Sequence, residues 1–329
     1  MSHEVQTMAY VGATPWHGLG SQLAQHQPLE VWAEAAGMNW RIEETDVMYR
    51  IGSHDLDPIH SFPAQKVLFR SDNKKPLSTV SKKYQVVQPS EILEFYRDLT
   101  EVGGYQLETA GVLKEGRKLW ALARTGQSVT LAGGDEVRGY LLLATACDGT
   151  LATTAQFTSV RVVCNNTLQI ALGRNRGAVK VPHRSQFDPR AVKEELGIAI
   201  SSWDGFMVRM HELAARKVSH TETERFFQKL FTYGWAKPEE STPEKVNERG
   251  LKAVLSLFEG NGRGATLESA AGTAWGLVNS VTEYVDHQQR ARSAGNRLDS
   301  AWFGAGAVLK QRAWDSALEM LDPSLAALV

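Results

Sequence analysis

Residues 137–163 read VRGYLLLATACDGTLATTAQFTSVRVV, two apolar runs separated by Asp148-Gly149. An Asp-Gly pair between two such runs is a strong hairpin signal, because the tight turn needs positive φ angles that these residues tolerate. The stretch therefore predicts two antiparallel β-strands, at 137–147 and 152–163, joined by a short turn.

Two more strand-like runs precede this hairpin, at 106–113 and 118–124. The breaks around them, Lys114-Glu115-Gly116 and Ala132-Gly133-Gly134-Asp135, have the composition of turns. Four consecutive runs with short turns between them predict a four-stranded antiparallel meander.

Helices are expected on both sides of this meander in the sequence. Pro89-Ser90-Glu91 is typical of a helix start, and apolar residues follow it at helical spacing. Asn165-Asn166-Thr167 offers a second helix cap with an apolar segment behind it. Short strands are expected further upstream, around 39–44, 66–70 and 84–87.

After Pro189 the pattern becomes helical to the end of the chain. Apolar residues recur three and four apart from Val192 to Leu213, which indicates one long amphipathic helix. We therefore predict an α+β fold in two domains, an α+β domain with the antiparallel sheet at 1–187 and a helical domain at 188–329.

Composition narrows the function classes. The chain has 36 Lys+Arg and 37 Asp+Glu, a net charge of −1, so a binding surface for an anion must be a local patch. No apolar run approaches the roughly 20 residues that cross a bilayer, and the N-terminus has no secretory signal. Two cysteines cannot form a disulfide framework. These features predict a soluble cytoplasmic protein without a membrane partner.

The segment between Asp148 and Asp188 contains no acidic residue. Its basic candidates for phosphate binding are Arg161, Arg174, Arg176, Lys180 and Arg184. Guanidinium groups bind phosphate oxygens two at a time, and the glycines beside Arg174 and Arg176 allow close approach of the backbone. The alternative is an ordinary solvated loop whose charges pair with acids elsewhere.

A second basic cluster consists of Lys74, Lys75, Lys82 and Lys83, followed by Tyr84. An aromatic ring can stack on a base while lysines follow the phosphates of a single strand. The alternative is a charged hairpin turn that keeps a sheet edge soluble.

Signals for catalysis are weak. His54 and His60 lack the helical spacing of a zinc pair, and Cys147 has no identifiable basic partner. The glycine-rich run 260–264 lacks the lysine and hydroxyl of a nucleotide-binding loop. We predict a protein that is not an enzyme, with no catalytic residues, no metal and no cofactor.

Five strings spread over the chain form a specific combination. They are Trp16-His17-Gly18-Leu19-Gly20, Tyr84-Gln85-Val86-Val87-Gln88, Asp148-Gly149-Thr150, the run from Arg161 to Leu168, and the run from Thr273 to His287. In these strings the chain resembles the phage- and plasmid-related proteins of the domain-of-unknown-function 932 (DUF932) family. The resemblance implies a mobile-element setting in a bacterial cytoplasm.

The order helix, antiparallel meander, helix is also similar to the core of Rad52-like single-strand annealing proteins, at the level of fold analogy. That similarity implies a ring-forming homo-oligomer with single-stranded DNA in a basic groove. The edge strands of a meander, which need covering or pairing, also favour a homo-oligomer.

Together these patterns predict a non-catalytic protein that binds single-stranded nucleic acid, and anneals strands, in phage or plasmid recombination or replication. An interaction protein that modulates a host or phage enzyme is the alternative.

Overall fold

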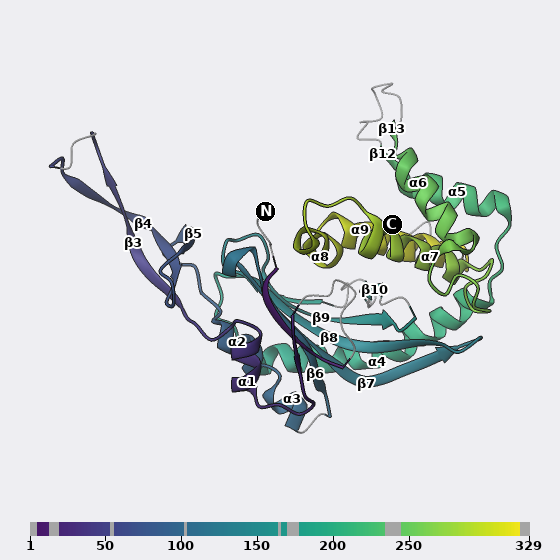
Figure 1. The fold of residues 1–329 in the computed structure, drawn as a ribbon, viewed down its shortest axis with the longest axis horizontal. Helices are drawn as coiled ribbons and strands as arrows, with labels where there is room; N and C mark the ends of the chain where they lie inside the picture. The colour runs from purple at the N-terminus through teal and green to yellow at the C-terminus, as the bar shows by residue number, and fades with distance from the viewer. Residues whose placement is uncertain are drawn as a thin grey trace.

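The computed structural model describes residues 5–12, 20–52, 56–101, 104–163, 166–169, 178–233 and 245–322. The fold class is α+β as predicted, with an antiparallel sheet between helices and a helical C-terminal part (Figure 1).

The predicted meander forms the centre of the main sheet. Its four strands are β6 (Gln106–Leu113), β7 (Lys118–Leu131), β8 (Asp135–Ala146) and β9 (Thr153–Arg161), each antiparallel to the next. The predicted Asp148-Gly149 turn joins β8 to β9, with Gly149 at a φ of +77°, in the left-handed region that glycine adopts without strain. Beyond β6 the sheet continues into β1 (Val5–Val11) and β2 (Ser21–Leu23).

The helix expected after Asn165 is wrong in the described part of that segment. Residues Asn166–Gln169 form strand β10, and Ala178–Val181 form β11. Both pair antiparallel with β9, one after the other along the same edge. An edge strand leaves a row of backbone groups unpaired, and this pairing satisfies them while burying Leu168 and Val179.

The strand expected at 84–87 is also absent, because this segment joins no ladder. It instead runs irregularly into the next helix, with Val87 buried. Its Gln85 N–H donates a hydrogen bond to the carbonyl of His183 (2.6 Å).

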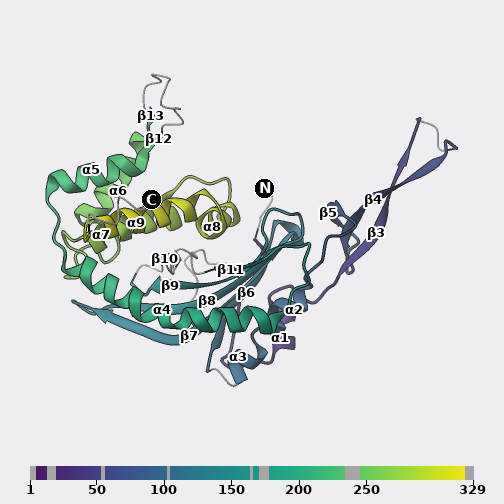
Figure 2. The same ribbon diagram turned by 180° about the vertical axis from the view of Figure 1, so that it is seen from behind.

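Helices cover both faces of the main sheet (Figures 1 and 2). On one face lie α1 (Leu29–Ala35), α2 (Pro89–Glu94) and α4 (Pro189–Ala215), and on the other α7 (Ala274–Glu283), α8 (Ala294–Phe303) and α9 (Ala305–Glu319). The remaining α-helices of the described residues are α3 (Arg97–Glu101), α5 (His220–Phe231) and α6 (Glu248–Ser256).

Burial on both faces explains the continuous apolar run of β8. Every residue from Gly139 to Cys147 is buried, as expected for a strand covered on both sides. Trp120 of β7 packs edge-to-face on Trp302 of α8, with ring centroids 5.0 Å apart. Tyr96, just after α2, donates its hydroxyl to carbonyls of β7 and β8.

The expected domain boundary coincides with the start of α4. Asp188 caps this helix and accepts the N–H of Arg190 at 2.9 Å. One connected set of buried apolar side chains nevertheless extends from Ala9 to Ala317, across that boundary. The division into two domains remains a prediction.

A separate three-stranded sheet projects from the body as an arm (Figures 1 and 2). It consists of β3 (Ile42–Arg50), β4 (Ile59–Arg70) and β5 (Pro76–Ser81). The predicted strands at 39–44 and 66–70 correspond to its base. β5 pairs with β4 only from Gln65 to Phe69, so the outer part of the arm is a two-stranded ribbon.

Asp299 of α8 ties the C-terminal helices to the sheet. Its carboxylate accepts hydrogen bonds from Lys118, which is buried, and from Lys114 (2.7 Å). Burial raises the pKa of Asp299, but the two ammonium groups outweigh burial and hold the pKa below its ordinary value.

Asp299→Asn is therefore expected to destabilise the protein by about 2 kcal/mol at pH 7, as for loss of a hydrogen bond to a charged group. Because the folded-state pKa is depressed, this stabilisation is full above the pKa of an unfolded aspartate, about 3.9. It is lost as the pH falls through the folded-state pKa. Urea unfolding of both proteins from neutral to acidic pH should show the difference shrinking. The exposed Asp204→Asn serves as control, and a pH-independent difference would contradict this role.

Candidate nucleic-acid interface

The fold brings one end of each predicted basic cluster to the same place. The ring of Tyr84 stacks on the imidazole of His183, with centroids 4.5 Å apart and an interplanar angle of 19°. Lys83 precedes the tyrosine and Arg184 follows the histidine. The segment that leaves the arm thus lies against the segment that leaves β11.

Hydrogen bonds hold both rings on the β8–β9 hairpin. The Tyr84 hydroxyl donates to the carbonyl of Ala146 (2.7 Å), and Nε2 of His183 lies 2.9 Å from the carbonyl of Leu151. Burial, with the nearby Cys147 and Asp148, raises the pKa of Tyr84, so its hydroxyl remains a donor. The ring face toward His183 is covered, which removes that face from the predicted stacking role of Tyr84.

Four of the predicted cations are exposed without a described acidic partner. They are Lys75, Lys83, Lys180 and Arg184. Within the described ranges, no carboxylate lies at ion-pair distance from any of them. Lys180, on β11, is separated from Arg184 by only three residues, at most about 14 Å of extended chain. Lys83 and Arg184 adjoin the Tyr84–His183 contact in the sequence, and Lys180 lies on the strand that leads to it. We call these three exposed cations the β11 patch.

Lys74 and Lys82 pair with acids of the arm. Lys74 contacts Glu43 (2.8 Å) and Lys82 contacts Asp46, both acids of β3. Exposed pairs of this kind contribute only about 0–1 kcal/mol, so phosphate can displace them at little cost. The arrangement also matches the alternative interpretation of this cluster as a charged, solubilising turn.

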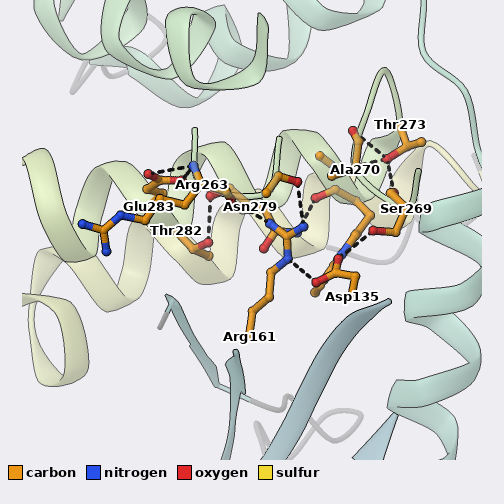
Figure 3. A network of polar contacts seen from close by, with 12 residues as sticks. Asp135, Arg161, Arg263, Ser269, Ala270, Thr273, Asn279, Thr282 and Glu283 are labelled. Carbon is orange, nitrogen blue, oxygen red and sulfur yellow. Dashed lines mark hydrogen bonds and ion pairs between the residues drawn. The ribbon is translucent and has the colours of Figure 1, made fainter. Parts of the chain in front are cut away.

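Arg161 does not fit its predicted role, because it is only 3% exposed. Its Nε donates to Asp135 (2.7 Å), and a terminal nitrogen donates to the carbonyl of Gly264 (3.0 Å) (Figure 3). Asp135 is fully buried and also accepts from Ser269 (2.6 Å) and from the indole of Trp275 (3.2 Å). Arg161 thus links β8 and β9 to the segment before α7, and its guanidinium cannot reach an external phosphate in this state.

The same network continues along α7 (Figure 3). The backbone N–H of Arg263 donates to the carboxylate of Glu283 (2.9 Å), and the Asn279 amide donates to the carbonyl of Trp275 (2.8 Å). Burial raises the pKa of Glu283, against the opposing effect of Arg263. The space beside these groups is no larger than one water molecule. The network is therefore a structural joint between sheet and helices.

A second buried joint was not predicted from the sequence. Lys310 of α9 is 2% exposed and donates to Asp286 (2.8 Å) and to the hydroxyl of Thr167 (2.7 Å). The backbone N–H of Thr167 also donates to Asp286 (2.7 Å), which attaches β10 to the helices. Asp286 and Thr167 both lie in the family-specific strings, the only signal that could have indicated them.

Some of the other predicted residues lie outside the described part of the chain, and Cys147 lies in the core. Arg174 and Arg176 lie outside the described residues, as does His54. Cys147 is buried, and burial together with Asp148 raises its pKa to about 12, which makes it a poor nucleophile. In the described ranges no cluster of His, Cys, Asp or Glu could hold a metal ion.

Comparison with known proteins gives one result. The family model described as "Domain of unknown function (DUF932)" matches residues 76–302, from β5 through the meander to α8. No curated protein and no solved structure matches the chain. Within the described part, no helix is both long and apolar enough to span a membrane. Since the match extends over well more than half of the sequence, the chain belongs to the DUF932 family.

Proposed function

We propose that this protein binds single-stranded nucleic acid, without catalysis, in phage or plasmid recombination or replication. The observation that carries the proposal is the Tyr84–His183 contact. It unites two basic segments, about 100 residues apart in sequence, at the edge of the main sheet.

The chemistry of the β11 patch suits a phosphate backbone. Lys83, Lys180 and Arg184 are exposed, and each can neutralise a phosphate. Arg174 and Arg176 belong to the same acid-free segment and are expected to add to the patch. Lys74 and Lys75 at the base of the arm, and Lys82 at the outer end of β5, would extend it. The near-neutral net charge means that binding depends on this local patch and on low salt.

The meander lies between helices α2 and α3 before it and α4 after it, although the short strands β10 and β11 come between β9 and α4; this order supports a further part of the proposal. We expect the protein to act as Rad52-like annealing proteins do, as a homo-oligomer in a bacterial cytoplasm. The main sheet ends in the short strand β2 on one side, an edge that a neighbouring subunit could cover.

Lys83→Ala combined with Arg184→Ala is expected to weaken binding to single-stranded DNA. The logarithm of the binding constant should fall with the logarithm of salt concentration by about 0.7 per phosphate neutralised. Loss of two contacts should therefore flatten the slope by about 1.4. Fluorescence anisotropy of a labelled oligothymidylate across a salt series measures this.

The matched control is Arg225→Ala with Lys252→Ala, one arginine and one lysine exposed on α5 and α6. This pair should leave the slope unchanged. An unchanged slope for Lys83→Ala with Arg184→Ala would remove the β11 patch from the interface. Absence of binding by the unaltered protein at low salt would overturn the proposed function.

An interaction protein remains a second candidate, because the outer arm exposes large apolar side chains. Leu56 is 98% exposed and Ile51 66%. Large apolar groups gathered on a projecting element mark surfaces that bind other proteins.

A further inference from the structure

The outer arm exposes large apolar side chains and a strand edge that no other described part of the chain covers. Its exposed large apolar residues are Met48, Tyr49, Ile51, Leu56, Ile59 and Phe62. A two-stranded ribbon is marginally stable in water unless another strand or surface packs on it. β3 is the first strand in the order β3-β4-β5, and within the described residues its outer edge has no ladder partner.

The residues of this edge are complementary to themselves. The run Asp46-Val47-Met48-Tyr49-Arg50 places an acid, an apolar residue and a base at alternate positions. The β3–β4 register shifts between Asp46 and Val47, but the extra residues, 63–65, belong to β4, so β3 keeps its alternation and Asp46, Met48 and Arg50 share one face. Val47 and Tyr49 lie on the other face. When a second copy of this run lies antiparallel to the first, the acid of each lies opposite the base of the other, and the valine opposite the tyrosine.

We infer that a second copy of this chain pairs antiparallel with β3, about a two-fold axis through Met48. Asp46 of each copy then lies opposite Arg50 of the other, and the two Met48 side chains meet between these ion pairs. On the opposite face, Val47 of each copy lies opposite Tyr49 of the other. Opposite-charge pairs and aromatic–β-branched pairs are the cross-strand combinations that stabilise sheets.

Side-chain pairing favours this register over its neighbours, because it alone combines opposite-charge pairs on one face with aromatic–β-branched pairs on the other and leaves no charge opposite an apolar residue. A two-fold axis normal to the sheet keeps each face on its own side, so paired residues must share a face and the axis must pass through a residue. An axis through Val47 sets Glu44 against Arg50 but leaves Asp46 opposite Met48, and an axis through Tyr49 sets Met48 against Arg50. An axis through Asp46 or Arg50 sets like charges directly opposite each other.

Arg50 already takes part in an interaction within the chain, and its guanidinium has five N–H donors, enough for a second acceptor. The contacts of Asp46 and Tyr49 are also compatible with this pairing. The side chain of Asp46 is 64% exposed although it contacts Lys82, and a carboxylate can accept donors from two directions. Tyr49 stacks on His60 across the hairpin, with centroids 5.4 Å apart, which holds its ring on the face where Val47 of the second copy would lie. The product is one continuous sheet, ordered β5-β4-β3-β3-β4-β5. The inference does not depend on nucleic-acid binding.

Charge exchange tests both the surface and its register. In light scattering without nucleic acid, the unaltered protein should be a dimer at micromolar concentration. Asp46→Arg alone and Arg50→Asp alone each place two like-charge pairs at the interface, and each should raise the dimer Kd by roughly tenfold or more. The double variant D46R/R50D keeps the same net charge and should restore the dimer.

Mixing the two single variants is the sharpest measurement. One variant then presents an arginine at both positions and the other presents an aspartate at both, so every cross-strand charge pair in a mixed dimer is attractive. A mixture should therefore form a heterodimer that neither variant matches alone. Circular dichroism confirms that the variants are folded. A monomeric unaltered protein, a dimer insensitive to both single variants, or failure of both the double variant and the mixture to restore dimers would each overturn the inference.

Discussion

Arg161→Met is expected to destabilise the protein by about 3–5 kcal/mol, the usual cost of breaking a buried ion pair by removing one partner. Asp135 is fully buried, and among the described residues only Ser269 and Trp275 would remain in this variant as side-chain donors to its carboxylate. The carbonyl of Gly264 would lose its guanidinium donor as well. The large cost follows because a buried carboxylate without a cation is not compensated by two neutral hydrogen bonds.

A double-mutant cycle, measured by urea unfolding, separates the interaction free energy of the Arg161–Asp135 pair from the other contributions of each residue. Asp135→Leu should also be strongly destabilising, because it leaves the Arg161 cation buried without its carboxylate. The double variant Arg161→Met with Asp135→Leu should cost less than the sum of the single variants, since no charge is left behind. Arg209→Met, which breaks the exposed pair with Glu212, is the control and should cost less than about 1 kcal/mol. If Arg161→Met were fully stable and lost only DNA binding, Arg161 would return to the phosphate interface.

Trp275→Ala is expected to cost about 3–5 kcal/mol, the range for emptying a buried aromatic site. Trp275 is 2% exposed on α7, and Val278, Thr282 and Val285, which follow at helical spacing, are also buried. The spacing of these residues on one helix face and the burial of Trp275 make it a packing anchor of α7. Its indole also donates to Asp135 (3.2 Å), so the substitution would remove one donor of the Arg161 network.

Trp275→Phe separates these two contributions. Phenylalanine keeps most of the apolar volume but cannot donate a hydrogen bond, so this variant should cost about 1 kcal/mol for the lost bond, plus a smaller packing loss. Thermal and urea unfolding of both variants measure the difference. A stable Trp275→Ala protein that had lost only nucleic-acid binding would instead make α7 part of the functional surface.

Local signals in the sequence were sufficient for the centre of the fold. The Asp148-Gly149 turn predicted the β8–β9 hairpin, because the backbone angles of that turn depend on two neighbouring residues alone. The long amphipathic spacing likewise predicted α4, and Thr273 caps α7 through its own hydroxyl. These features depend on residues close together in the chain.

Elements that depend on distant partners were not predictable in the same way. Asn165-Asn166-Thr167 has the composition of a helix cap, but the described part becomes strand β10 because β9 offers an unpaired edge beside it. The pairing of β1 with β6 joins segments about 100 residues apart, and no local sequence pattern predicts this pairing. The outer arm was missed because its apolar residues point into solvent and form no core pattern.

For the candidate site, the sequence by itself determined where basic residues are concentrated, since composition along the chain needs no partner. Only the tertiary structure decided which of them face solvent. Arg161 is buried because Asp135 and the segment before α7 converge on it. Lys83 and Arg184 instead remain exposed beside Tyr84 and His183, whose rings stack on each other. A charged side chain is free for a ligand or used within the fold according to which groups surround it after folding, and that depends on contacts between residues far apart in the chain.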